Sequence, residues 1–159
     1  EEKLILFQKT LEQKLISLYT ASIAELYIIL DNEYEKEGDT YDFDGFISDD
    51  GFLYFRCWLL LKGKEFYEDI TKDIESFVSG KYHFDIAETW AEELLYIADL
   101  ANAEARPDSD EDIIRDTANE KWPELNYDFG EFAMDREPES GGALQKMYPK
   151  LVAEIMPIR

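Results

Sequence analysis

Apolar residues recur at helical spacing along most of the chain. Between residues 3 and 32 they fall three or four positions apart, which predicts one long helix, or two helices broken near Thr20. Shorter amphipathic segments follow at residues 64–78, 86–105, 108–122 and 143–156. Pro107 and Pro123 end the middle two, and Pro149 either kinks the last segment or starts a second short helix.

Two of these segments make detailed predictions. The helix at residues 86–105 is expected to bury one face, formed by Ile86, Trp90, Leu94, Ile97, Ala98, Ala101 and Ala105. The helix at residues 108–122 is expected to begin at Asp108 or Ser109, since both side chains suit an N-cap. No segment shows an alternating pattern that favours a strand over a helix.

Residues 123–142 have no sustained period and contain Pro138 and three glycines, Gly130, Gly141 and Gly142. They predict an irregular excursion between two helical regions. The whole pattern predicts an all-α fold: a single domain spanning residues 1–159, built as an irregular bundle of about five to seven helices.

The most apolar stretch begins after an acidic turn and predicts a central buried helix. Ser48 or Asp49 can cap its first turn, and the carboxylates of Asp49 and Asp50 suit the positive end of the helix dipole. Positions 52–61 carry nine apolar or aromatic residues, so no polar face remains. Gly63 follows as the stop signal.

Arg56 is the exception in this helix. An unpaired buried guanidinium costs several kcal/mol, so it must reach solvent or find partners. We expect Arg56 to tie the central helix to a neighbouring acidic helix.

The segment before this helix, residues 31–50, carries nine acidic residues and only Lys36 in opposition. It predicts an exposed acidic loop. Four aromatic residues lie among the acids, namely Tyr34, Tyr41, Phe43 and Phe46. They either present anchors to a partner or attach the loop to the core, and we favour the second role for Phe43 and Phe46.

Charge narrows the classes of partner. With 37 acidic and 16 basic side chains the net charge is −21, which repels nucleic acid and anionic membrane surfaces and complements a basic protein. The alternative is that the acidity serves only solubility. No apolar run approaches the roughly 20 residues of a membrane span. The chain has a single cysteine, Cys57, which is compatible with a reducing cytoplasm. The sequence begins at Glu1 and does not decide whether a leader peptide was removed.

No motif specifies a reaction, a metal or a cofactor. His83 is the only histidine, and no nucleophile motif lies beside it. Asp108, Asp110 and Asp112 have the opening spacing of a calcium loop, but Ile113 replaces the required glycine. A P-loop and a dinucleotide-binding glycine motif are both missing from the sequence. We therefore predict no catalytic residue, no metal ligand and no cofactor.

Three motifs resemble a bacterial family, the domain of unknown function numbered 4240. The first is the run from Ser48 to Leu59 followed by Gly63; the others are Glu93-Leu94-Leu95-Tyr96-Ile97-Ala98, and Leu144 with Tyr148-Pro149-Lys150-Leu151. The resemblance extends over residues 11–155. It implies the fold and extent of the domain and no catalytic residue, since the family has no established activity.

Two hypotheses follow. The first is a non-enzymatic acidic binding protein that engages a basic protein, as an immunity protein or inhibitor engages a toxin or nuclease in a bacterial cytoplasm. Its contact residues would be Tyr34, Asp39, Tyr41, Asp42 and Asp44.

The alternative is a small-molecule or enzymatic site at Asp49, Asp50 and Arg56. A solvated pocket that contains these three residues would favour such a site, whereas an Arg56 sealed against carboxylates would favour a structural role. The sequence does not specify the oligomeric state.

Overall fold

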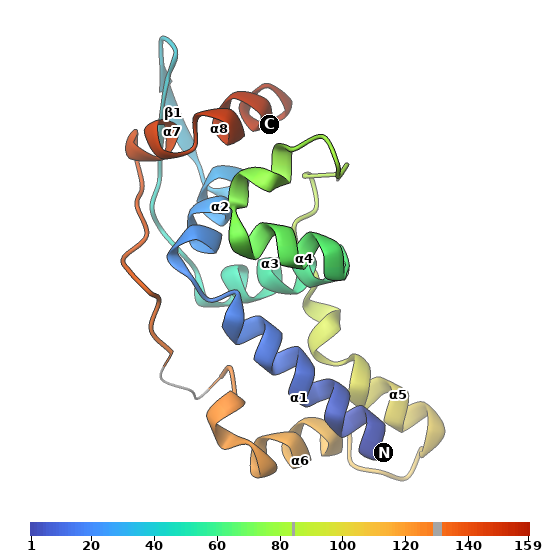
Figure 1. Ribbon diagram of the computed structural model, residues 1–159. Coiled ribbons are helices and arrows are strands. Elements are labelled where there is room, and N and C mark those ends of the chain that lie inside the picture. The colour runs from blue at the N-terminus through green and yellow to red at the C-terminus, as the bar shows by residue number, and fades with distance from the viewer. Residues whose placement is uncertain (84, 129–131) are drawn as a thin grey trace.

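The computed structural model describes residues 1–83, 85–128 and 132–159. Within these residues the chain forms eight α-helices, four short 3-10 helices and one two-stranded sheet (Figure 1). The predicted all-α fold class is confirmed, since the sheet is only a hairpin. The number of α-helices exceeds the predicted five to seven because two expected helices are each divided.

The N-terminal periodicity forms two helices, α1 (Glu2–Ser17) and α2 (Ala21–Asp31). The break falls at Thr20, whose side chain accepts a hydrogen bond from the backbone N–H of Ile23 at 3.3 Å and so caps α2. Only one side of α1 is buried, whereas α2 is buried on most sides, including the carboxylate of Glu25.

Helix α3 (Asp49–Leu61) is the predicted central helix. Ser48 Oγ accepts from the N–H of Gly51 at 3.2 Å, so the expected cap is confirmed. Gly51 is required by packing, since a Cβ there would lie 2.7 Å from the hydroxyl of Tyr27. The Tyr27 ring is itself held against Phe52 and Phe55 at centroid distances of 5.8 and 5.3 Å.

The acidic segment is mostly exposed, as predicted, but the prediction of a loop was wrong for residues 34–43, which form a hairpin. Strands β1 (Tyr34–Glu37) and β2 (Thr40–Phe43) pair in antiparallel fashion around a two-residue turn, Gly38-Asp39. Gly38 has φ 59° and no described non-glycine residue has positive φ, which fits a type II′ hairpin turn. The hairpin projects from the helical body beside the last helices (Figure 1).

The next predicted helix is interrupted after two turns. Helix α4 (Lys64–Lys72) is followed by the 3-10 helix η1 (Ile74–Val78), and the break falls at Asp73, whose side chain caps η1.

The predicted helix at 86–105 was half wrong. Regular structure starts only with η2 (Glu92–Leu95) and continues as α5 (Ile97–Ala105). The expected inward face is only partly correct. Ala98 is buried as predicted, but Trp90 and Ile97 are exposed, and Asp99 and Asn102 are buried instead. The physical reason is that Asp99 must face the next helix.

Helix α6 (Ile113–Lys121) begins later than predicted, and neither Asp108 nor Ser109 caps it. Asp99 Oδ1 instead accepts from the N–H groups of Ile114 and Arg115 at 2.8 and 3.3 Å. The side chain that caps α6 therefore belongs to α5, and the sequence around the start of α6 does not reveal it. The expected stop at Pro123 is confirmed, since that proline opens the 3-10 helix η3 (Pro123–Leu125).

In the excursion at 123–142, the described residues after η3, 126–128 and 132–142, are irregular. Residues 129–131, which include Gly130, lie outside the described part of the chain. The described end of the excursion, residues 132–142, is here termed the strap and runs along the body up to α7 (Ala143–Met147) (Figure 1). Pro149 then starts α8 (Pro149–Ile155), which is followed by η4 (Met156–Ile158).

The core has two parts. The larger cluster joins α1, α2, α3, α4 and α8 and includes Phe43 at the base of the hairpin. The smaller one holds Ile5, Ala98, Ile114 and Ala118 where α1, α5 and α6 meet. Throughout the described ranges, each helix is too short or too polar to cross a membrane.

Candidate functional site

The hairpin separates aromatic from acidic side chains. Tyr34 pairs with Phe43 and Lys36 with Tyr41, while Glu35 pairs with Asp42 and Glu37 with Thr40. Because successive side chains in a strand point to opposite faces, the aromatic residues share one face and Glu35, Glu37 and Asp42 share the other. Phe43 is buried, so the aromatic face leads into the core and the acidic face meets solvent.

A shallow depression of about 340 Å³ lies at the base of the hairpin. Its lining consists of four carboxylates and two aromatic rings: Glu33, Tyr34, Glu35, Asp42, Phe43 and Asp44. Among the residues that the structure describes, no group of three or more acids, histidines or cysteines is arranged to hold a metal ion. The depression instead offers separate carboxylates and ring faces, which are the contacts that an arginine or lysine side chain makes.

The hairpin is held in place by the end of the strap and by α7. Gln145 accepts from the N–H of Tyr41 at 2.9 Å and donates to the carbonyl of Asp39 at 2.8 Å. The N–H of Gly141 donates to the carbonyl of Phe43 at 2.8 Å. The outer edge of β2 is therefore covered, and the acidic face is presented in a fixed orientation.

Phe46 was expected to attach to the core, but its side chain is 73% exposed. Its backbone is nevertheless fixed, since the amide of Asn32 donates to the carbonyls of Asp44 and Phe46 at 2.6 and 2.7 Å. Asp44 Oδ1 also accepts from the N–H of Phe46 at 2.8 Å. A large apolar side chain thus stands in solvent on a constrained turn beside the acidic depression.

Within the described part of the chain, Arg56 pairs with backbone carbonyls and with no carboxylate, contrary to the prediction. Nη1 donates to the carbonyl of Leu15 at 2.7 Å and Nε to that of Phe52 at 3.3 Å. The guanidinium also lies 5.0 Å from the ring centre of Tyr19 and 4.8 Å from that of Phe52. Burial lowers the pKa of Arg56 to about 10, so the group remains charged at neutral pH.

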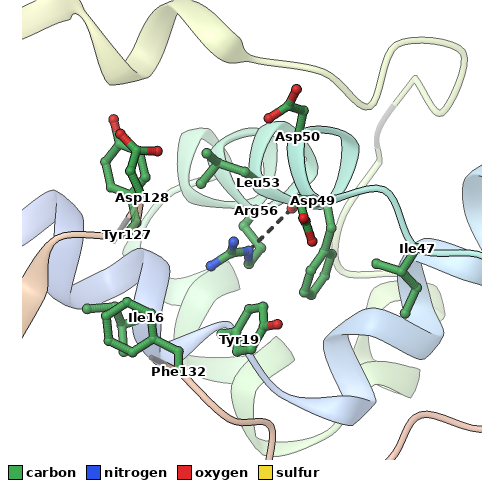
Figure 2. Close-up of a pocket in the computed structure, with 11 residues that line it drawn as sticks. Ile16, Tyr19, Ile47, Asp49, Asp50, Leu53, Arg56, Tyr127, Asp128 and Phe132 are labelled. Atoms are coloured by element: carbon green, nitrogen blue, oxygen red, sulfur yellow. Dashed lines mark hydrogen bonds between the residues drawn. The ribbon is translucent and has the colours of Figure 1, made fainter. Parts of the chain in front are cut away.

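Arg56 forms one wall of a pocket of about 320 Å³ (Figure 2). The other lining residues are Ile16, Tyr19, Ile47, Asp49, Asp50, Phe52, Leu53, Tyr127, Asp128 and Phe132. Three carboxylates therefore share the pocket with one guanidinium. Burial raises the pKa of Asp128; Arg115 opposes this shift and Asp50 adds to it.

The strap, which supplies Phe132 to this pocket, is fastened to α2. Glu25 is fully buried and accepts hydrogen bonds from Arg136, from the hydroxyl of Tyr148 and from the N–H of Glu139. Asp135 Oδ1 accepts from the N–H of Ala21 at 2.9 Å. The pocket wall is thus held by a helix cap and by an ion pair whose carboxylate is buried and whose guanidinium is exposed.

The structure brings together part of the first predicted set and all of the second. Tyr34, Asp42 and Asp44 line the depression, whereas Tyr41 lies on the aromatic face and Asp39 sits at the turn.

Asp49, Asp50 and Arg56 line one pocket, the arrangement that favours a site.

Sequence reasoning missed two groups of residues. Glu35, Phe46 and Gln145 contribute to the hairpin surface, and Tyr127 and Asp128 to the pocket. A signal for the hairpin existed, since a Gly-Asp pair flanked by alternating aromatic and charged residues indicates a two-residue turn.

These features define a mainly helical domain with an acidic hairpin and a pocket beside its central helix. The model of the family described as "Protein of unknown function (DUF4240)" matches residues 1–104, and the chain belongs to this family. The match includes the motifs at 48–63 and 93–98, while the third motif lies beyond it. No curated protein and no solved structure matches the chain.

Proposed function

We propose that this protein is a non-enzymatic binding protein that engages a basic protein partner through the acidic face of the hairpin. The observation that carries the proposal is the pairing of Glu35 directly opposite Asp42. Like charges at opposed positions of a strand pair destabilise it, by roughly 0.2–1 kcal/mol. A bound arginine or lysine would convert this repulsion into two attractive contacts.

Folding alone does not account for the arrangement. Charges on an exposed edge strand discourage pairing with another chain, and this explains the acids on β1. It does not explain Asp42, because β2 is covered on its outer edge by Gly141 and Gln145. The acids of the hairpin also attract a cation over a distance, which speeds encounter at low salt.

Phe46 supplies the apolar contact that such an interface needs. Binding energy concentrates in a few buried aromatic or arginine side chains surrounded by polar residues. Phe46 is fixed in solvent beside Asp44, so little conformational entropy is lost when a partner covers it. An immunity protein or inhibitor that neutralises a basic toxin or nuclease in a bacterial cytoplasm would use this combination.

The test is capture of partners from source cells by the full chain and by two triple variants with the same change in charge. The first variant reverses three charges on the hairpin, with Asp39→Lys, Asp42→Lys and Asp44→Lys. The second is the control and reverses three charges in an exposed region near α5 and α6, with Glu104→Lys, Asp108→Lys and Asp110→Lys. A basic protein should be retained by the wild type and the control and lost from the hairpin variant. Its association rate should fall steeply as salt rises.

Two results would contradict the proposal. One is equal retention by all three proteins, which would place the interface elsewhere. The other is a partner whose association is unchanged by salt and by Phe46→Ala, which would show that neither the acids nor the aromatic side chain contributes.

A further inference from the structure

We propose that the pocket beside α3 binds a small zwitterion of amino-acid size, with the ligand carboxylate on Arg56 and the ligand ammonium against Asp49, Asp50 and Asp128. This site is separate from the hairpin surface and does not depend on the function proposed for it.

The first argument is the hydrogen bonding of Arg56. The side chain is only 6% exposed, yet only Nε and Nη1 have partners among the described residues. The end of the guanidinium points into the space ringed by the pocket residues (Figure 2). Its remaining N–H groups are therefore directed at the pocket, and a carboxylate is their strongest small acceptor.

The second argument is that folding gains little from a charge at this position. A well-packed apolar side chain of similar volume is often as stabilising as a buried ion, because desolvation of the ion is costly. Here the cost is met by two carbonyls and the faces of Tyr19 and Phe52. The helix thus holds a cation ready at the bottom of a cavity, which is the preorganisation that ligand binding requires.

The other charges of the pocket narrow the class of ligand. Asp49, Asp50 and Asp128 line the same pocket as Arg56, so a phosphate or other polyanion would meet three carboxylates. A ligand that carries one carboxylate and one ammonium matches both charges. Between them the wall is apolar, with Ile16, Leu53 and Phe132 available to a hydrocarbon side chain. The cavity of about 320 Å³ accommodates one such molecule and excludes a folded partner.

The test is calorimetric titration of the full chain with L-leucine and L-phenylalanine as probes. Two analogues remove one charge each: N-acetyl-L-phenylalanine lacks the ammonium and L-phenylalanine amide lacks the carboxylate. One site per protein is expected. Each analogue should bind at least about tenfold more weakly than L-phenylalanine, since a charge-assisted contact is lost.

Variants assign the two charges. The double variant Asp49→Asn with Asp128→Asn should bind L-phenylalanine at least about tenfold more weakly than the wild type does. Its affinity for N-acetyl-L-phenylalanine should be unchanged or higher. Arg56→Gln should weaken binding of L-phenylalanine and of N-acetyl-L-phenylalanine, which both carry a carboxylate, and leave binding of L-phenylalanine amide unchanged. Asp116→Asn with Glu120→Gln on exposed positions of α6 is the matched control and should bind like the wild type.

Arg56→Gln is informative only if it unfolds at a temperature near that of the wild type; otherwise the double variant of Asp49 and Asp128 decides. Failure of both amino acids to bind at millimolar concentration would overturn the proposal. So would an N-acetyl analogue that binds as tightly as L-phenylalanine, or a double variant that binds like the control. None of these outcomes bears on capture of a basic protein by the hairpin.

Discussion

The hairpin and the body beneath the strap hold charge in opposite ways. The hairpin collects carboxylates on a solvated face, where Lys36 lies on the other face and balances none of them directly. The body contains a few charged side chains that are almost fully buried, chiefly Arg56, Glu25 and Glu12. The difference shows which charges the fold depends on and which it merely carries.

Exposed charges contribute little to stability because water screens them, and removing one seldom costs more than about 1 kcal/mol. A buried charge must instead be satisfied by specific neighbours, and removing a partner costs roughly 3–5 kcal/mol. The acids of the hairpin are therefore free to serve recognition. The buried groups constrain the geometry of the body. Arg56 does both, because its N–H groups that have no partner among the described residues face a cavity.

Replacing Glu25 is expected to have the largest effect on stability. Glu25→Ala leaves the Tyr148 hydroxyl and the Glu139 N–H without their acceptor and opens a cavity. The free energy of unfolding, measured in urea, should fall by about 3–4 kcal/mol. Glu137→Ala, at an exposed strap position, is the control and should change it by less than about 0.5 kcal/mol. Equal effects of the two substitutions would show that the strap is not fastened through Glu25.

The same carboxylate gives this contribution a pH dependence. Burial alone would raise the pKa of Glu25, but hydrogen bonds from Arg136, Glu139 and Tyr148 outweigh it and hold the pKa below its usual value of 4.5. A lowered pKa in the folded state means that the carboxylate stabilises fully above about pH 4.5 and less as pH falls through the folded pKa. Glu25→Ala should therefore be least harmful in strong acid.

The pKa of Glu12 is raised, whereas that of Glu25 is lowered, and replacing Glu12 is expected to change stability less. Its Oε1 accepts from Gln8 at 3.0 Å, while Glu12 Oε2 and Gln8 Oε1 are buried and have no hydrogen-bond partner among the residues that the structure describes. Burial raises the pKa of Glu12, Gln8 opposes the shift, and Asp128 adds to it. A proton on Oε2 would supply the donor that both oxygens lack, so the folded protein favours the protonated acid.

Glu12→Gln provides that donor at every pH. The variant should be more stable than the wild type at pH 7 by roughly 1 kcal/mol, the usual size for relief of an unpaired buried acceptor. Because the folded pKa is raised, wild-type stability is lost as pH rises from about 4.5 through the folded pKa, and the advantage should vanish below pH 4.5. Unfolding at pH 4 and pH 7 measures this, with Glu120→Gln as the exposed control. An advantage that does not depend on pH would contradict the assignment.

The sequence predicted features that depend on neighbours along the chain. The apolar run and the Ser48 cap identified α3, and Pro123 and Pro149 marked helix ends. It failed where an element depends on a distant side chain. Asp99 is buried because it caps α6. No pattern within α5 reveals that role.

The two candidate sites were predictable to different degrees. The acids of the hairpin were visible from composition. The strands were missed because charged residues make up most of β1 and because the Gly38-Asp39 turn was overlooked. For the pocket, Asp49, Asp50 and Arg56 lie within one helix and were identified, whereas Asp128 and Phe132 come from the far end of the chain. The partners of Arg56 are backbone carbonyls, which leave no mark in a sequence.

Removing charges from the hairpin is expected to have the smallest effect on stability. This result gives the sharpest test of the contrast between the exposed charges of the hairpin and the buried charges of the body. Asp39→Asn, Asp42→Asn and Asp44→Asn together remove three charges while keeping side-chain size and the Asp44 oxygen that accepts from Phe46. The free energy of unfolding should change by less than about 0.5 kcal/mol, and relief of the Glu35–Asp42 repulsion favours a slight gain. That gain should shrink with added salt, which screens the repulsion in the wild type. A loss above about 1 kcal/mol would mean that these carboxylates support the fold, and recognition would no longer be needed to explain them.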